Sequence, residues 1–128
     1  MKKGTRRIKK KALVNLIKSY SGIMPEKTTL VFLGDNIYKY GLPNLDDLPL
    51  EKDKKCAGRA CAESRLDVQI DLAREHHVRG IFIPGNHDWN NDRENGWERI
   101  RNMGDYLAKV RSDENVNVSF LPGNGCPG

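Results

Sequence analysis

The chain is predicted to be an α/β protein in which parallel strands are joined by helical crossovers. Three short apolar segments have the composition of strands, at residues 28–34, 81–85 and 116–120. Segments with apolar residues at helical spacing alternate with them, at residues 8–20, 60–77 and 97–110. Alternation of this kind is typical of a parallel sheet covered by helices.

The first helix is amphipathic and basic. It is expected to end near residue 21, with Gly22 as a stop signal and Pro25 just beyond. Residues 1–20 carry eight Lys or Arg and no acid, and without them the net charge of +5 becomes −3. The excess therefore belongs to the helical segment 1–24. These basic residues are expected to form a solvated helix face, because no aromatic residues alternate with them as they do in proteins that bind single-stranded nucleic acid. Contact with nucleic acid is the alternative.

The strands at 28–34 and 81–85 are expected to be buried on both faces, because neither shows polar alternation. Their crossover should be right-handed. Both strands then end at the same edge of the sheet, where sites of open α/β folds form.

The remaining segments are less regular. Residues 39–58 are predicted to be a long loop, either functional or disordered, and residues 90–95 a polar turn.

Cys56, Cys61 and Cys126 are too few for a disulfide framework. A local bond between Cys56 and Cys61 and free thiols are both open. No apolar run is long enough for a membrane span. The basic start lacks the rest of a signal peptide, so localisation is left open.

Polar residues follow both of the predicted neighbouring strands. They read Gly34-Asp35-Asn36-Ile37-Tyr38 and Gly85-Asn86-His87-Asp88. The Asp35 carboxylate can bridge two cations, Asn86 offers a neutral amide oxygen, and a Tyr38 phenolate suits Fe³⁺. Two such ions would lower the pKa of a bound water.

The histidine and the acid beside it complete the candidate site. His87 can be a general acid or hold a phosphate oxygen, and Asp88 could orient its imidazole. Each residue also has a structural explanation, since Gly-Asp after a strand is commonly a turn with a capping Asp. His76 and His77 fit the last turn of a helix, and Trp89 and Trp97 fit packing.

The two segments together resemble signature blocks of the calcineurin-like metallophosphoesterases, GD-x-x-(D or Y) and GNH-(D or E). Tyr38 is similar to the purple acid phosphatase variant. The resemblance implies that Asp35 bridges two metal ions (Fe, Mn or Zn) and that Asn86 ligates one, with Tyr38 a ligand at an iron-type site. His87 and Asp88 would be catalytic, and Asn36 and His87 would bind substrate. The implied reaction is hydrolysis of a phosphate ester by a metal-bound hydroxide.

The chain departs from this family at both ends. No aspartate block precedes Asp35, and no Gly-His-x-His follows Asp88. The expectation is one partial metallophosphoesterase domain over residues 1–128, with its core at 28–128, lacking the first strand and the C-terminal half. Because these metal-ligand blocks are missing, the chain alone is expected to bind metal ions weakly and to have little phosphatase activity. Exposed apolar surface, poor solubility, and association with itself or a complementary fragment are also expected. The alternative function is a non-catalytic module that binds phosphate or a partner.

Overall fold

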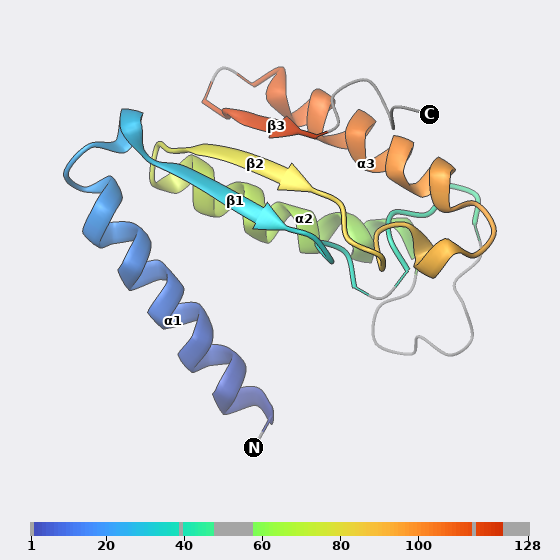
Figure 1. The fold of residues 1–128 in the computed structure, drawn as a ribbon, viewed down its shortest axis with the longest axis horizontal. Coiled ribbons are helices and arrows are strands. Elements are labelled where there is room, and N and C mark those ends of the chain that lie inside the picture. The colour runs from blue at the N-terminus through green and yellow to red at the C-terminus, as the bar shows by residue number, and fades with distance from the viewer. Residues whose placement is uncertain (1, 39, 48–57, 114, 122–128) are drawn as a thin grey trace.

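The computed structural model describes residues 2–38, 40–47, 58–113 and 115–121 (Figure 1). Over these residues three helices alternate with three strands, and two single-turn 3₁₀ helices lie between them. In chain order the elements are α1 (Lys2–Ser21), η1 (Pro25–Lys27), β1 (Thr29–Leu33), α2 (Gly58–Glu75), β2 (Arg79–Ile83), η2 (Asn90–Asp92), α3 (Gly96–Arg111) and β3 (Val118–Phe120). The predicted α/β class is confirmed.

The three described strands form one parallel sheet in the order β1-β2-β3. In the pairing of β1 with β2, Thr29 lies opposite Arg79 and Leu33 lies opposite Ile83. The two strands therefore begin and end level with each other. The chain segments that follow Leu33 and Ile83 leave the sheet side by side, as the sequence predicted.

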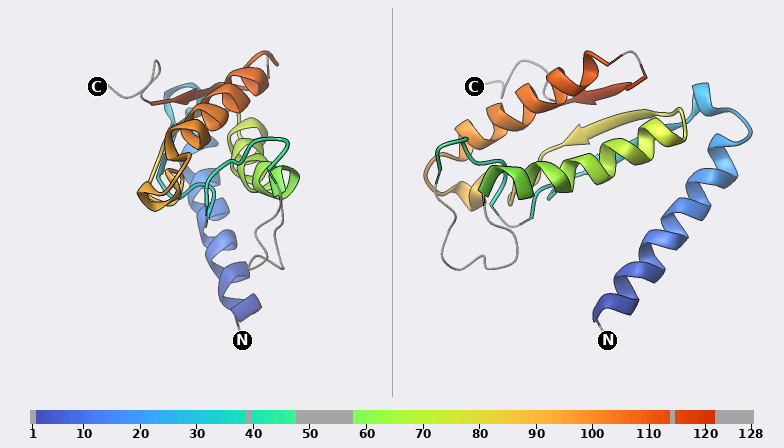
Figure 2. Two further views of the ribbon diagram at one scale, coloured as in Figure 1. Left: turned by 90° about the vertical axis from the view of Figure 1, so that its right-hand side faces the viewer. Right: turned by 180° about the vertical axis from the view of Figure 1, so that it is seen from behind.

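The core lies between one face of the sheet and helices α2 and α3. Seen from behind in Figure 2, both helices lie in front of the strands. Phe32 and Phe82 stack across neighbouring strands with ring centroids 4.6 Å apart. The buried side chains that surround them come from both helices, from β3 and from the loops: Ile37, Leu42, Ala62, Leu66, Ile70, Ala73, Val78, Met103, Leu107, Val116 and Val118.

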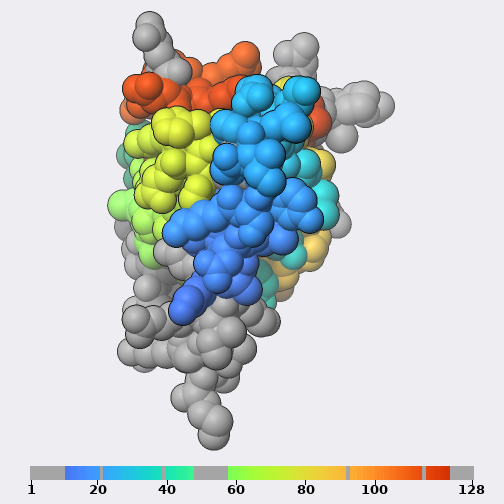
Figure 3. All heavy atoms as spheres, turned by 90° about the vertical axis from the view of Figure 1, so that its left-hand side faces the viewer, coloured from blue at the N-terminus to red at the C-terminus, as the bar shows by residue number. Residues whose placement is uncertain are grey.

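The opposite face of β1 is only partly covered. Helix α1 slants away from the sheet in Figure 1, and Ile17 is the side chain that it buries among the residues whose side chains are described. In Figure 3, the coloured part of α1 and the turn that follows it (blue) lie at the front of this end of the molecule. Between α1 and β1 lies a cavity of about 260 Å³ lined in part by Leu13, Ile17, Val31 and Leu33.

The prediction that β1 is buried on both faces is wrong. Val31 is 46% exposed and Leu33 is 82% exposed. Leu30 and Phe32 pack against the core, so the side chains that alternate with them face the other side of the sheet, and β1 is an edge strand of the described sheet. The expectation of exposed apolar surface on the sheet and helices is confirmed, since α1 also exposes Leu16 and Tyr20.

Side chains from the helices hold the described part of the predicted loop in place. Arg99 donates to the Tyr40 carbonyl at 2.9 Å, and Asn102 donates to the Leu42 carbonyl at 3.1 Å. Residues 40–47 contain no helix or strand, as predicted. The rest of this prediction, at 48–57, lies outside the described residues. Cys61 is disulfide-bonded; the proposed pairing with Cys56 also lies outside them.

Within the described part of the chain, we find no helix with the length and apolar character needed to cross a membrane.

Candidate functional site

Two loops meet at the edge of the sheet where β1 and β2 end. We name them the Asp35 loop (residues 34–38) and the Asn86 loop (residues 85–91). A Cβ atom on Gly34 would lie 2.9 Å from the Gly85 Cα, and one on Gly85 would lie 2.5 Å from Asp35 Oδ1. Both distances are shorter than van der Waals contact. The glycine that begins each motif is therefore required because the backbones of the two loops touch.

A buried carboxylate joins the two loops. Asp88 is 1% exposed. Its Oδ1 accepts a hydrogen bond from the Ile37 nitrogen at 2.8 Å, and its Oδ2 accepts from the nitrogens of Gly85 at 2.8 Å and Asn36 at 3.1 Å. Burial raises the pKa of this carboxyl, and the three backbone donors oppose that rise. Asp88 thus binds backbone amides, and its role in orienting the His87 imidazole stays a prediction.

Asn36 also takes part in this bracing. Its side chain is buried, and its Nδ2 donates to the Ile83 carbonyl at 2.9 Å, at the end of β2. Its own carbonyl accepts from Gln69 of α2 at 3.0 Å. The side chain that was expected to contact substrate is used within the fold. Its role in substrate binding stays a prediction.

Asp35 is exposed at the surface of the paired loops. Its Oδ1 accepts a hydrogen bond from the His87 nitrogen at 3.1 Å. Among the described residues, no group donates to its Oδ2. The backbone of Asp35 has a φ of 50°, in the left-handed region that non-glycine residues seldom adopt. Strain of this kind concentrates at functional sites.

Asn86 and His87 lie beside Asp35 on the second loop. Asn86 is exposed, and its Nδ2 donates to Asn91 Oδ1 at 2.7 Å. No group among the described residues donates to Asn86 Oδ1. The imidazole of His87 is half-buried and lies against the exposed ring of Tyr38, with centroids 4.3 Å apart and planes tilted by 51°. The structure therefore brings Asp35, Tyr38, Asn86 and His87 together.

Asn91 is a residue of this cluster that the sequence analysis did not single out. Besides its bond to Asn86, its Nδ2 lies 3.3 Å from His87 Nδ1. The sequence placed it in a polar turn, where any hydrophilic residue is unremarkable. Its one distinguishing signal is its type, since Asn is enriched in the left-handed conformation that Asn91 adopts, with φ 53° and ψ 43°.

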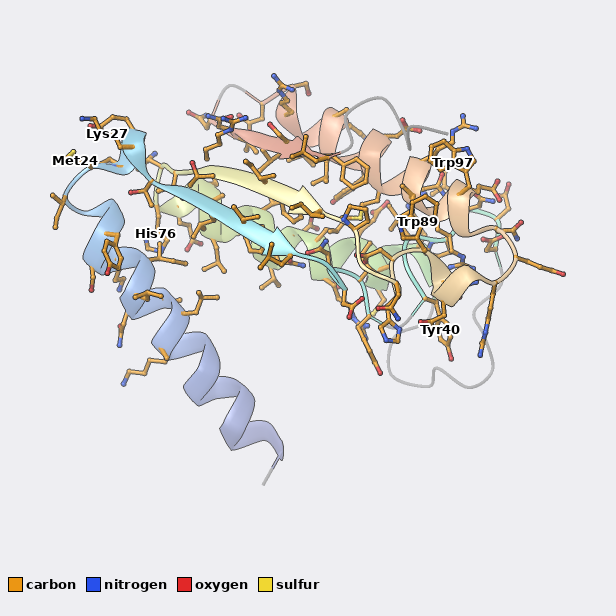
Figure 4. The ribbon with its side chains drawn as sticks, viewed as in Figure 1. Met24, Lys27, Tyr40, His76, Trp89 and Trp97 are labelled. Atoms are coloured by element: carbon orange, nitrogen blue, oxygen red, sulfur yellow. The ribbon has the colours of Figure 1, made fainter. Side chains whose placement is uncertain are left out.

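The other candidate residues lie outside the cluster. Trp89 and Trp97 stack with centroids 5.8 Å apart, as expected for packing residues. Figure 4 shows His76 at the opposite end of the molecule from both tryptophans. His76 and His77 were expected in the last turn of a helix, but they lie in the turn just after α2, which ends at Glu75, and His77 has a left-handed φ of 54°.

The donor set fits hard metal ions. No donor from the described residues uses Asp35 Oδ2 or Asn86 Oδ1, and carboxylate and carbonyl oxygens suit Mn²⁺ and similar ions. Among the described residues, no three His, Cys, Asp or Glu side chains converge. Asp35 and Asn86 therefore supply part of a coordination shell. No known family model, curated protein or solved structure matches this chain.

Proposed function

We propose that the paired loops form part of a dinuclear metal centre that hydrolyses phosphate esters. The observation that carries the proposal is the cross-bracing of two motifs from separate strands. The Asp35 carboxylate accepts a hydrogen bond from the His87 nitrogen of the Asn86 loop. The Asp88 carboxylate accepts one from the Ile37 nitrogen of the Asp35 loop. This bracing fixes a carboxylate oxygen and an amide oxygen at one sheet edge without using either in a hydrogen bond among the described residues. The choice of phosphate esters rests on the resemblance of the two motifs.

The residues divide between ligands, substrate contact and support. Asp35 would be the ligand shared by the two ions, and Asn86 would ligate one of them through its amide oxygen. Tyr38 would join them where the ion is ferric. His87, half-buried beside these groups, would hold a phosphate oxygen or protonate the leaving group. Asp88 and Asn36 hold the two loops together through their hydrogen bonds to the backbone.

Bound divalent or trivalent ions would supply Lewis acidity and a nucleophile at neutral pH. The protein's part is to hold the ligands in place before the ions arrive. Two or three oxygens are few for this task, because a buried ion needs enough ligands to offset the loss of its water. We therefore expect weak metal affinity and little phosphatase activity from these residues alone.

Weak binding is best detected with a paramagnetic probe. We would titrate the ¹⁵N-labelled chain with Mn²⁺ and follow the broadening of each amide signal. Signals of residues 34–38 and 85–91 should broaden first in the wild type. The Asp35→Asn variant should lose this local broadening, because the amide still accepts the hydrogen bond of the His87 nitrogen but carries no charge.

A matched control separates a built site from general attraction to acids. Asp46→Asn removes another exposed carboxylate, outside both loops, and should leave the local broadening unchanged. Broadening that spreads evenly over exposed acidic residues would contradict the metal proposal. Shifts of the same loop signals with inorganic phosphate alone, without any response to Mn²⁺, would instead favour the non-catalytic phosphate-binding module.

A further inference from the structure

We propose that one side of α1 binds the surface of a membrane that contains anionic lipids. The proposal is independent of the metal centre, because it uses no residue of either loop. It rests on the order of basic and apolar residues along the helix and on the side chains that the helix exposes.

One line of positions along α1 changes from basic to apolar. Positions that follow one another at alternating steps of four and three residues lie on the same side of a helix. Positions 2, 6, 9, 13, 16 and 20 of α1 follow this spacing, and they read Lys, Arg, Lys, Leu, Leu and Tyr. We name this line the α1 stripe. Its first half is cationic, and its second half is apolar.

The apolar half of the α1 stripe is exposed. Leu13 is 42% exposed, Leu16 is 56% exposed and Tyr20 is 65% exposed. The helix meets the sheet through a neighbouring side, where Leu13 and the buried Ile17 line the cavity beside β1. Contact with the sheet therefore leaves Leu16 and Tyr20 available to a partner.

The turn after α1 extends this exposed apolar surface. Ile23 is 75% exposed and Met24 is 45% exposed. Figure 4 shows Met24 and Lys27 at the same end of the molecule, and Lys27 is exposed as well. The turn thus adds two apolar side chains and one cation at the end of the helix.

An anionic bilayer matches both halves of the α1 stripe. Residues 1–20 carry eight Lys or Arg and no acid. Clusters of about four to eight basic residues on an amphipathic helix are typical of segments that bind anionic lipids. Lipid phosphates would attract the basic half, while Leu16 enters the boundary between headgroups and acyl chains. Tyr20 suits that boundary because its ring is apolar and its hydroxyl is polar.

Two other partners match the helix less well. Nucleic acid would attract the basic half through its phosphates but would leave the apolar half in water. A second copy of the chain could cover the apolar half, but it would bring together two helices of the same strong charge, which repel each other. A bilayer satisfies the charge and the apolar residues at once.

The first experiment is flotation of the whole chain with lipid vesicles. Vesicles made of equal parts of phosphatidylglycerol and phosphatidylcholine should carry the chain with them. Vesicles of phosphatidylcholine alone should not, because they lack the negative charge. A chain that does not float with the anionic vesicles would overturn the proposal.

Two pairs of lysines test which side of α1 faces the lipid. Lys2 and Lys9 belong to the α1 stripe, whereas Lys11 and Lys18 each follow them by about two and a half helical turns and so lie on the opposite side. A helix is about 10–12 Å across, and the Debye length at physiological salt is about 8 Å, so the far side is screened from the lipid.

The two double variants should therefore differ. A cation near the membrane surface contributes about fivefold in affinity, so Lys2→Gln with Lys9→Gln should weaken vesicle binding by about 30-fold. The matched control, Lys11→Gln with Lys18→Gln, removes the same charge and should weaken it much less. Equal losses in the two double variants would overturn the assignment of the α1 stripe.

Leu16→Gln tests the apolar half. The side chain is exposed in the chain alone and Gln is a good helix former, so helix content measured by circular dichroism should not change. Loss of its burial in lipid should weaken binding to the anionic vesicles by about tenfold. Val68→Gln, at a 49% exposed position of α2, is the matched control and should leave vesicle binding unchanged.

The same variant separates the bilayer from the other partners. Vesicle binding that is unchanged in Leu16→Gln would show general attraction between charges and would overturn the proposal. A wild type that binds single-stranded DNA but no vesicles would identify nucleic acid as the partner. A wild type that binds no vesicles, and whose self-association in sedimentation velocity is lost in Leu16→Gln, would identify a second copy instead.

Discussion

The Oδ1 atom of Asp88, on the second loop, accepts a 2.8 Å hydrogen bond from the backbone nitrogen of Ile37, on the first. This bond joins segments that are far apart in the sequence. With the bonds from Asn36 and Gly85, it satisfies backbone donors that would otherwise be buried without a partner. The reciprocal bond from the His87 nitrogen to Asp35 completes the brace. The relative position of the two loops therefore depends on carboxylate-to-backbone bonds as well as on the sheet.

Replacing Asp88 by Asn should destabilise the fold. The amide can accept through one oxygen only, and its own NH₂ group would face backbone donors. A buried donor left unsatisfied costs about 1–3 kcal/mol. We expect the free energy of unfolding, measured in urea, to fall by an amount in that range. Asp105→Asn, on the exposed face of α3, is the control and should change it little. An Asp88→Asn variant as stable as the control would contradict the bracing role.

The close approach of the loops gives a second prediction. Gly34 and Gly58 both have a positive φ, of 101° and 79°, so alanine is strained at either position. An added Cβ at Gly34 would lie 2.9 Å from the Gly85 Cα, whereas at Gly58 no atom of the described residues lies within 4 Å. Gly34→Ala should therefore lower the free energy of unfolding by about 1–3 kcal/mol more than Gly58→Ala, the typical cost of overpacking. Equal losses in urea denaturation would show that the loops can separate freely.

Tyr106 gives a prediction about pH. Its hydroxyl donates to the Asp67 carboxylate, and burial, together with that carboxylate, raises its pKa above the ordinary value. The unfolded chain then ionises before the folded one. The stabilisation from Tyr106 is fully present below a pH of about 10 and is lost as the pH rises above it. The difference in unfolding free energy between wild type and Tyr106→Phe should shrink between about pH 8 and about pH 11.

Asp67→Asn serves as the control for this pH dependence. It removes the neighbouring charge but leaves burial, which is the largest cause of the shift. The decline above a pH of about 10 should therefore be weaker in this variant than in the wild type, yet still present. A difference between wild type and Tyr106→Phe that stays constant with pH would contradict the assignment.

The sequence was sufficient to predict the order of the described strands and the edge at which the motifs meet, although β2 spans Arg79–Ile83 and not the predicted 81–85. Two apolar segments separated by one helical segment force parallel pairing, and parallel strands end at the same edge. Whether β1 is covered could not be predicted in this way. A run of apolar residues such as 29–33 has the same composition in a central strand and in an edge strand whose outer face meets few neighbours.

The roles of Asp88 and Asn91 were beyond pattern reasoning for a different reason. The partners of Asp88 are backbone amides of Asn36 and Ile37, and backbone donors leave no trace in the residue types. The side-chain contacts of Asn91 with Asn86 and His87 depend on its left-handed backbone conformation, which its residue type alone does not specify. The identity of a ligand can be predicted from its chemistry, but a supporting residue is recognised only from its geometry.

The exposed edge of β1 gives the last prediction. Leu33 is 82% exposed on β1, whose outer edge pairs with no strand in the part of the chain that the structure describes, an arrangement that favours association between chains. Leu33→Lys should lower self-association, measured by sedimentation velocity across a concentration series, at little cost in stability because the side chain buries little surface. Leu45→Lys is the matched control, since Leu45 is 80% exposed but lies in a loop. If both variants reduced association equally, general charge would explain the effect, and the strand edge would not. A reduction confined to Leu33→Lys would locate the contact on β1, where a lysine opposes strand addition both by its charge and by its need for water.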